Sequence, residues 1–304
     1  MASFDHVSAA RLKTHIDEVE LPLRRSGAHA ESAAEILRYG AFIGSEVHCH
    51  ASLDRTMVRA RRAINQLEEA GRSIRSGTTI IAASLTGSKG RFTRHWHAPP
   101  GGLWGTVILV NTLLPRFRNL LPQTVGVACC EAVRRYGVPA TIRWINDVLV
   151  DERKIAGFLC ESFTGERSGE EYCLLGFGIN VNNEQFPHEL RDSAASVSMV
   201  AGRSVDLTRF ACDFLAALAF QVGLLHYHET RVLRQETEEH PHPLLLLWRE
   251  LSDSIGRPVV YGFDVVARPQ YRARTVEVTN DGGLRLRLED GREIVEYSGE
   301  IRYL

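Results

Sequence analysis

The stretch from Arg143 to Glu161, RWINDVLVDERKIAGFLCE, constrains the fold more than any other part of the chain. It contains two apolar runs, 148–150 and 155–159, on either side of the charged turn 151–153. Short apolar runs that flank a polar turn are typical of two buried strands joined as a hairpin. The sequence therefore predicts a hairpin of core strands with its polar turn at the surface.

Charged and amide side chains stand at the mouths of these two strands. Arg143, Asn146 and Asp147 precede the first strand, and Lys154 opens the second. An ammonium group held against an apolar strand is partly desolvated, so its charge is costly unless an anion meets it. For a lone lysine, a surface hairpin with solvated charges is the more common explanation, so the choice depends on the rest of the chain.

Composition excludes several classes of function. The 304 residues are 44% hydrophobic and 24% charged, which is ordinary for a globular protein. The 36 basic and 37 acidic residues nearly cancel, so no overall field favours nucleic acid. Six cysteines without CxxC spacing predict reduced core thiols, and no apolar run approaches the roughly 18 residues of a membrane span. The N-terminus has no signal-peptide core, so we expect a soluble, cytoplasmic protein that binds no DNA and no membrane.

Apolar periodicity divides the chain into three parts. Residues 1–41 form a polar N-terminal extension with weak helical periodicity, which is short for a full winged helix. Residues 42–252 alternate β-branched strands with amphipathic helices, as expected for a catalytic domain. Residues 253–304 change to period two with Asn-Asp-Gly and Asp-Gly turns, which predicts a small barrel of short strands.

Capping residues predict where the helices of the middle part begin. Ser52 or Asp54 is a candidate N-cap for one helix, and Pro122 is a good first residue for another. Asp206 is expected to cap a long amphipathic helix that runs to about Glu229.

The connector 236–243, ETEEHPHP, contains His240 and His242. Two histidines are potential metal ligands. Because prolines separate them and no third ligand is near, the sequence favours a solvated loop over a metal site.

A glycine-rich basic loop lies at 84–104, SLTGSKGRFTRHWHAPPGGLW. Lys89, Arg91 and Arg94 follow closely on one another, and Trp96 comes just beyond them. Glycines let backbone N–H groups approach an anion, guanidinium groups bind phosphate in a bidentate manner, and an indole offers a flat face to a purine. The loop is not a P-loop, and by itself a flexible solvated loop explains it equally well.

A third segment, LLGFGINVN at 174–182, predicts a buried strand with Gly176 and Gly178 spaced by two. Glycines inside a strand usually mark the close approach of a ligand or another backbone. A bulge explains one such glycine well but explains two alternating glycines poorly.

In order and spacing, these segments resemble the biotin–protein ligases of the biotin/lipoate ligase superfamily. The family shows a Ser-Thr-Asn element, a Gly-Arg-Gly-Arg-x-x-Arg-x-Trp loop before Gly-Gly-Leu, a Lys-Trp-Pro-Asn-Asp hairpin ending in Lys-hydrophobic-Ala-Gly, and a Gly-x-Gly-Ile-Asn strand. The matching segments here are Ser52-Leu53-Asp54, the loop from Ser88 to Pro99 with Gly101-Gly102-Leu103, Arg143-Trp144-Ile145-Asn146-Asp147, Lys154-Ile155-Ala156-Gly157 and Gly176-Phe177-Gly178-Ile179-Asn180. The resemblance covers roughly residues 42–304. It implies an α+β fold with a mixed central sheet flanked by helices, as in the class II synthetase-like catalytic domain, plus a small C-terminal SH3-like β-barrel.

The resemblance also implies a two-step acyl transfer. Biotin and ATP would form biotinyl-5′-AMP, and a lysine of a biotin carboxyl carrier protein would then take the biotin. Mg²⁺ is expected with the triphosphate, held mainly by phosphate oxygens because the sequence shows no dense carboxylate cluster and hence no protein metal site. A homodimer is left open.

Site residues are carried over from the matching motif positions. The catalytic set is Lys154, Arg91 and Asp147. The biotin-binding set is Ser52, Ser88, Lys89, Arg91, Lys154, Gly157 and Gly176. The ATP-binding set is Arg91, Arg94, Trp96, Arg143, Asn146 and Asn180.

Departures from the family pattern affect which acid substrate is expected, and not whether the chain can form an adenylate. Ser88 and Lys89 replace Gly and Arg, and Ile145 replaces Pro, but the phosphate-binding cations remain. Leu53 and Leu85 replace polar groups near biotin, and each missing hydrogen bond costs about 1–3 kcal/mol. Three alternatives stay open: a lipoate or octanoate ligase, a ligand-binding repressor, and a degenerate member that does not ligate.

Overall fold

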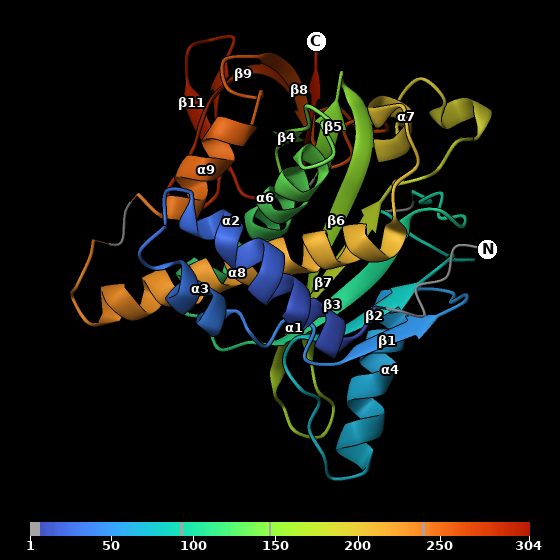
Figure 1. Ribbon diagram of the computed structural model, residues 1–304. Helices are drawn as coiled ribbons and strands as arrows, with labels where there is room; N and C mark the ends of the chain where they lie inside the picture. Colours follow the sequence, from blue (N-terminus) through green and yellow to red (C-terminus); the bar gives the residue numbers. More distant parts are fainter. Residues whose placement is uncertain (1–6, 92–93, 146, 239–240) are drawn as a thin grey trace.

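The computed structural model describes residues 7–91, 94–145, 147–238 and 241–304 (Figure 1). A mixed seven-stranded sheet has the order β1-β2-β3-β7-β6-β5-β4, and a separate antiparallel sheet has the order β11-β10-β9-β8-β12. The strands of the first sheet are β1 (Val47–His50), β2 (Thr78–Ala82), β3 (Leu103–Val110), β4 (Thr141–Arg143), β5 (Asp147–Val150), β6 (Arg153–Thr164) and β7 (Glu171–Ile179). Those of the second are β8 (Pro258–Gly262), β9 (Tyr271–Val278), β10 (Leu284–Leu288), β11 (Glu293–Glu296) and β12 (Glu300–Tyr303).

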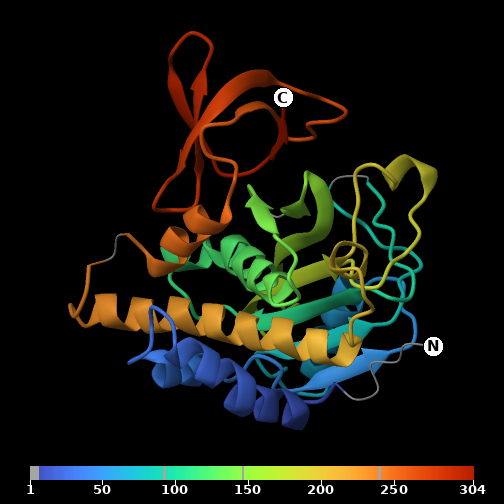
Figure 2. The same ribbon diagram turned by 45° about the horizontal axis from the view of Figure 1, so that its top comes forward.

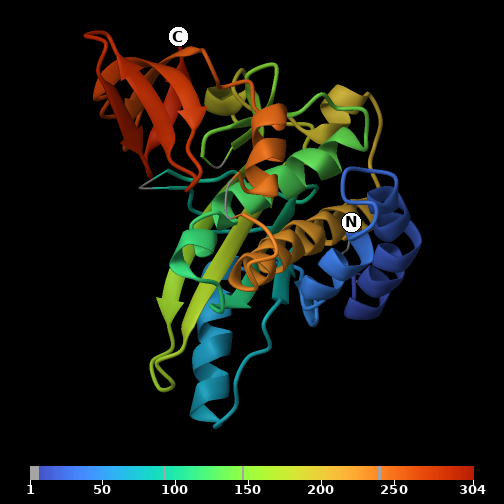
Figure 3. The ribbon, with the colours of Figure 1, turned by 90° about the vertical axis from the view of Figure 1, so that its left-hand side faces the viewer.

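Helices cover both faces of the seven-stranded sheet. They are α1 (Ala9–His15), η1 (Ile16–Glu20), α2 (Leu21–Arg25), α3 (Ala33–Tyr39), α4 (Thr56–Glu69), α5 (Pro115–Arg118), α6 (Leu121–Arg134), η2 (His188–Leu190), α7 (Val197–Ala201), α8 (Leu207–Leu233) and α9 (Pro243–Leu251). Helix α4 packs on β2, β3 and β7, whereas α6 and α8 pack together and cover the opposite face (Figure 3). The predicted α+β architecture with a mixed, helix-flanked sheet is confirmed.

The predicted hairpin at 143–161 is present as β5 and β6. Asp151 and Glu152 form its turn with φ angles of 46° and 61°. Two consecutive left-handed residues match the twist of paired strands, so the polar turn closes the hairpin tightly. Val148, Leu149 and Val150 are buried, as core strands require.

Asp206 caps α8 as predicted, and its carboxylate accepts hydrogen bonds from the N–H groups of Thr208 and Arg209. This helix is long and apolar enough to cross a membrane, but 89% of its apolar window is buried inside the fold. It is therefore the central core helix. Pro122 lies in the first turn of α6, also as predicted.

The predicted cap of α4 is wrong. The residue before the helix is Arg55, in an extended conformation, and no side chain caps the helix. Ser52 and Asp54 cannot cap the helix because residues 53–54 still pair with residues 84–87 before the helix begins. Leu53 N–H donates to the Ser84 carbonyl, and Gly87 N–H donates to the Asp54 carbonyl.

His242 is buried, contrary to the predicted solvated loop. Its side chain is 1% exposed, and Nδ1 accepts the N–H of Leu244 at the start of α9. The ring packs against His228 with centroids 4.4 Å apart. His240 lies outside the described residues.

The C-terminal period-two pattern forms the second sheet, which stands above α6 and α9 (Figure 2). β11 and β12 are the two edge strands of this sheet and do not pair with each other, so the sheet is open and not a closed barrel. The β9–β10 turn contacts α6 and the residue after β4, because the carbonyl of Gly282 accepts hydrogen bonds from Gln123 Nε2 at 3.0 Å and Trp144 Nε1 at 3.2 Å.

The N-terminal helices lie along α8 (Figure 2). Two glycines allow α3 and α8 to cross at backbone contact. A Cβ on Gly223 would lie 2.1 Å from the carbonyl oxygen of Ile36, and one on Gly40 would lie 1.8 Å from that of Ala219. Buried Glu20 adds ion pairs with Arg24 and Arg135. Residues 9–40 are thus packed into the same core as α8.

Gly223→Ala should destabilise the protein by about 2 kcal/mol or more, because backbone atoms leave no room for a methyl group. Urea unfolding followed by circular dichroism measures the change. Gly126→Ala on α6 is the matched control: its added methyl would meet Ile142 Cγ2 at 3.7 Å, an ordinary contact. There the helix propensity of alanine should make the change neutral or stabilising. Equal stability of Gly223→Ala and wild type would contradict the close crossing.

Candidate functional site

Two facing glycines form a flat platform in the middle of the sheet. Gly157 of β6 pairs with Gly178 of β7. A Cβ on Gly178 would lie 2.8 Å from Trp96 Nε1, and one on Gly157 would lie 2.9 Å from Lys154 Nζ and 3.1 Å from Trp96 Cζ3. The glycines are therefore required for the indole to lie on the sheet. The close approach at Gly178 is made by a side chain, and not by the ligand or backbone that the sequence predicted.

A carboxylate shared by two cations lies beside the platform. Asp147 Oδ1 is 2.5 Å from Lys154 Nζ, and its Oδ2 accepts a hydrogen bond from Arg143 Nη2 at 2.6 Å. Burial alone would raise the pKa of Asp147, but the two cations outweigh burial and hold that pKa at about 2. Lys154 Nζ also lies 5.1 Å from the centre of the Trp96 ring.

The backbone of Lys154 is fixed from both sides. Its N–H donates to the Ser193 carbonyl at 2.8 Å, and its carbonyl accepts the N–H of Ala195 at 3.0 Å. Asn180 is 3% exposed, and its Nδ2 donates to the carbonyls of Ala195 at 3.1 Å and Lys154 at 3.4 Å. Asn180 therefore positions the lysine strand, while its buried Oδ1 has no hydrogen-bond partner in the described part of the chain.

The basic loop folds back on itself before it reaches Trp96. Gly90 N–H donates to the Arg94 carbonyl at 2.8 Å, and Lys89 pairs with His95 through the backbone. Ser88 is buried, and its hydroxyl donates to the carbonyl of Trp96. Ser88 thus fixes the loop end that carries the indole, a role its position in the motif did not indicate.

The loop is docked on the C-terminal sheet. Arg91 Nη1 donates to the carbonyl of Gly299 at 2.6 Å, and Arg94 forms an ion pair with Glu300. Tyr261 holds the turn before β12 in place, since its hydroxyl donates to the Ser298 carbonyl at 2.9 Å. Burial lowers the pKa of Arg91, and the Glu300 and Asp147 carboxylates partly oppose this change. No motif or spacing in the sequence predicts these two contacts.

The other residues predicted for the site lie in different surroundings. Gly176 lies against the Met57 side chain, where an added Cβ would meet Sδ at 2.9 Å. Ser52 and Lys89 are exposed, and among the described residues neither side chain has a hydrogen bond or an ion pair. Asn146 lies outside the described residues.

A further residue, Tyr303, joins the site from the C-terminal strand. The Arg143 guanidinium lies 5.8 Å from the centre of its ring and that of Arg257 lies 3.6 Å away. Burial raises the pKa of the Tyr303 hydroxyl, which contacts Ser254 and Asp253. No motif singled out this tyrosine, because its role depends on how the two sheets meet.

The arrangement suits an anionic substrate. Lys154 and Arg143 each form an ion pair with Asp147, and the charges of both Glu300 and Asp147 act on Arg91. A carboxylate or phosphate oxygen can take the place of Asp147 on Lys154 while a flat ring meets Trp96. Within the described ranges, no group of three or more His, Cys, Asp or Glu side chains could hold a metal ion.

Comparison with known proteins agrees with this chemistry. Residues 56–180 match the Biotin/lipoate A/B protein ligase family. The bifunctional ligase/repressor BirA of Bacillus subtilis (strain 168) is 29% identical over 188 residues, which are 60% of this chain and 56% of the relative. The biotin–[acetyl-CoA-carboxylase] ligase of Paracoccus denitrificans is 30% identical over 148 residues, 45% of this chain and 59% of the relative. The matches thus span little more than half the length of these relatives.

Among solved structures, the biotin protein ligase from Aquifex aeolicus in complex with biotin and ATP superposes with a TM-score of 0.66. The sequences are 21% identical, and the superposition covers 85% of this chain and 99% of the other. Similarity at this level establishes the fold.

Asp147→Asn tests the shared carboxylate through the pH dependence of stability. The pKa of Asp147 is about 2 in the folded state and about 3.9 in an unfolded chain. The ionised Asp147 carboxylate therefore stabilises the fold fully only above about pH 4. The free energy of unfolding of wild type should exceed that of the variant by about 2 kcal/mol there, and the difference should shrink as pH falls towards about 2. Urea unfolding at several pH values measures it. Asp192→Asn, which changes an exposed aspartate, is the control, and a pH-independent difference for Asp147→Asn would refute the pairing.

Proposed function

We propose that this chain is an ATP-dependent biotin–protein ligase, because residues 56–180 match the Biotin/lipoate A/B protein ligase family. The observation that carries the proposal is the position of Lys154, which opens β6 beside the glycine platform, under Trp96 and within reach of Asp147. A single partly desolvated ammonium group at this position can bind a carboxylate and a phosphate oxygen in turn.

In the first step, a carboxylate oxygen of biotin attacks the α-phosphorus of ATP. The bond from that phosphorus to the β-bridging oxygen breaks, and pyrophosphate leaves. Lys154 would bring the two anionic groups together, and Arg91 and Arg94 would leave Gly299 and Glu300 to bind the phosphates. Charge neutralisation and orientation thus supply most of the catalysis.

In the second step, the uncharged amine of a carrier lysine attacks the carbonyl of the acyl-adenylate and expels AMP. Asp147 would orient the incoming ammonium group and assist its deprotonation once Lys154 is bound to the nucleotide. The proposed acceptor is a biotin carboxyl carrier protein. Mg²⁺ with ATP would be held mainly by phosphate oxygens, since the described residues offer no carboxylate cluster.

Other parts of the proposal concern assembly and location. The C-terminal sheet is proposed to correspond to the SH3-like barrel of these ligases, and residues 1–41, 42–252 and 253–304 to their extension, catalytic and small domains. A cytoplasmic enzyme without DNA binding fits the net charge of −1.

One observation favours a second candidate, a lipoate or octanoate ligase. Leu53 and Leu85 pair through their backbones near the start of the basic loop. Their apolar side chains offer no hydrogen bonds to a ureido ring but suit an acyl chain.

ATP–pyrophosphate exchange, with biotin, lipoate and octanoate offered separately, tests the proposal. We expect acid-dependent exchange with biotin, at least tenfold above the rates with the other two acids. A reaction without acid is the control for contaminating activity. Preference for lipoate or octanoate would establish the second candidate instead, and no exchange with any acid would make the chain a member that does not ligate.

A further inference from the structure

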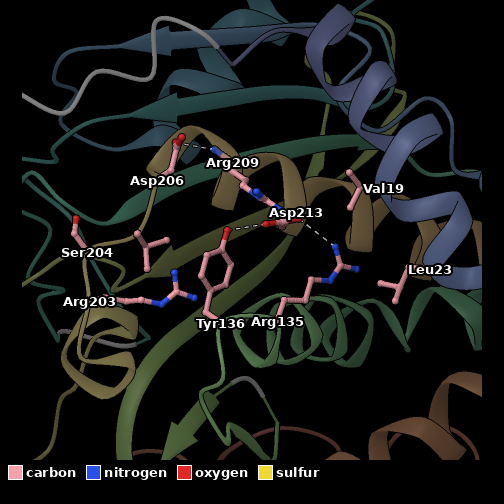
Figure 4. Close-up of a pocket in the computed structure, with 10 residues that line it drawn as sticks. Val19, Leu23, Arg135, Tyr136, Arg203, Ser204, Asp206, Arg209 and Asp213 are labelled. Carbon is pink, nitrogen blue, oxygen red and sulfur yellow. Dashed lines mark hydrogen bonds and ion pairs between the residues drawn. The ribbon is translucent and has the colours of Figure 1, made fainter.

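A hollow of about 640 Å³ lies where the N-terminal helices meet α6 and the start of α8 (Figure 4). Val19 and Leu23 come from the N-terminal helices, Tyr136 follows α6, and Arg203 and Arg209 flank the N-cap of α8. Its volume lies in the range of small-molecule sites, and half of its ten lining residues are charged. None of the residues proposed for adenylation lines this hollow.

Both carboxylates of the hollow are already engaged by the protein. Asp206 accepts the N–H groups of Thr208 and Arg209 at 2.9 and 3.0 Å. Asp213 accepts hydrogen bonds from Tyr136 at 2.7 Å and Arg135 at 3.4 Å, and its Oδ1 is 2.9 Å from His15 Nε2. Arg135 also forms an ion pair with Glu20, with Nη2 and Oε2 2.6 Å apart.

Two further arginines, Arg203 and Arg209, line the hollow. In the described ranges, neither the Arg203 guanidinium nor that of Arg209 has a hydrogen bond or ion pair. Figure 4 shows the Arg203 side chain extending towards the Tyr136 ring. Guanidinium groups that face a common hollow without a carboxylate partner are suited to bind an anion from solution.

The apolar wall limits what that anion can be. Leu23 is 46% exposed and Val19 is partly buried, whereas Val205 is already only 4% exposed. Val205 is held rigidly, because its N–H and carbonyl both bond the side-chain amide of Asn182, at 3.0 and 2.8 Å. A simple inorganic anion would leave this wall in water, whereas an aliphatic chain would cover it.

We propose that this hollow is a second ligand site, which binds a short aliphatic carboxylate with its head group on Arg203 and Arg209 and its chain against Val19, Leu23 and Val205. The ligand would order exposed side chains on the N-terminal helices and on the segment before α8. It would thereby clamp these two parts of the fold together.

Isothermal titration calorimetry with octanoate as the probe tests the site. Octanoate is also a candidate substrate, so the titration is repeated with Lys154→Ala, which removes the catalytic cation and should retain the second site. Arg203→Gln combined with Arg209→Gln should weaken this binding about tenfold or more. Octanamide, which has the same chain without charge, should bind at least tenfold more weakly than octanoate.

Arg272→Gln is the matched control, because this arginine is also exposed but lies on β9 of the C-terminal sheet. It should bind octanoate like wild type. Leu23→Ser should weaken octanoate while leaving acetate unchanged. The site is refuted by absence of saturable binding to wild type, by unchanged affinity in the double arginine variant, or by loss of all binding in Lys154→Ala.

Discussion

The carboxylate of Asp147 organises the charged end of this molecule. It lies between Lys154 at 2.5 Å and Arg143 at 2.6 Å, and these two cations keep its pKa near 2 despite burial. Without the carboxylate, both cations would stand partly desolvated at the mouth of a core hairpin, which is costly. The same arrangement makes Lys154 available to an anionic ligand, because one carboxylate exchanges for another with little change in charge.

The remainder of the site depends on how this cluster is supported. Asn180 fixes the Lys154 backbone, and the Gly157–Gly178 pair brings Trp96 onto the sheet above it. The C-terminal sheet holds the opposite side, where Arg91 contacts the Gly299 carbonyl and Arg94 the Glu300 carboxylate. The C-terminal sheet therefore holds two arginines of the basic loop although it contributes no motif of its own.

Local sequence patterns predicted the features that depend on interactions between residues close together in the sequence. The 143–161 hairpin, the Asp206 cap and the close approach at the strand glycines follow from periodicity, capping and the absence of Cβ. The contacts of Arg91 and Arg94 join residues 208 and 206 positions apart, and no spacing rule reaches so far. The cap of α4 and the exposure of His242 were mispredicted for the same reason, since tertiary packing decided both.

The proposed adenylation reaction depends most on Lys154. Lys154→Ala should retain the fold, since the side chain lies at the edge of the core, as circular dichroism would verify. Single-turnover formation of biotinyl-AMP from biotin and ATP measures its role most directly. We predict a loss of several orders of magnitude, because the ammonium group beside Asp147 and Trp96 would no longer neutralise the two reacting anions. Adenylate formation within about tenfold of the wild-type rate would contradict the central claim.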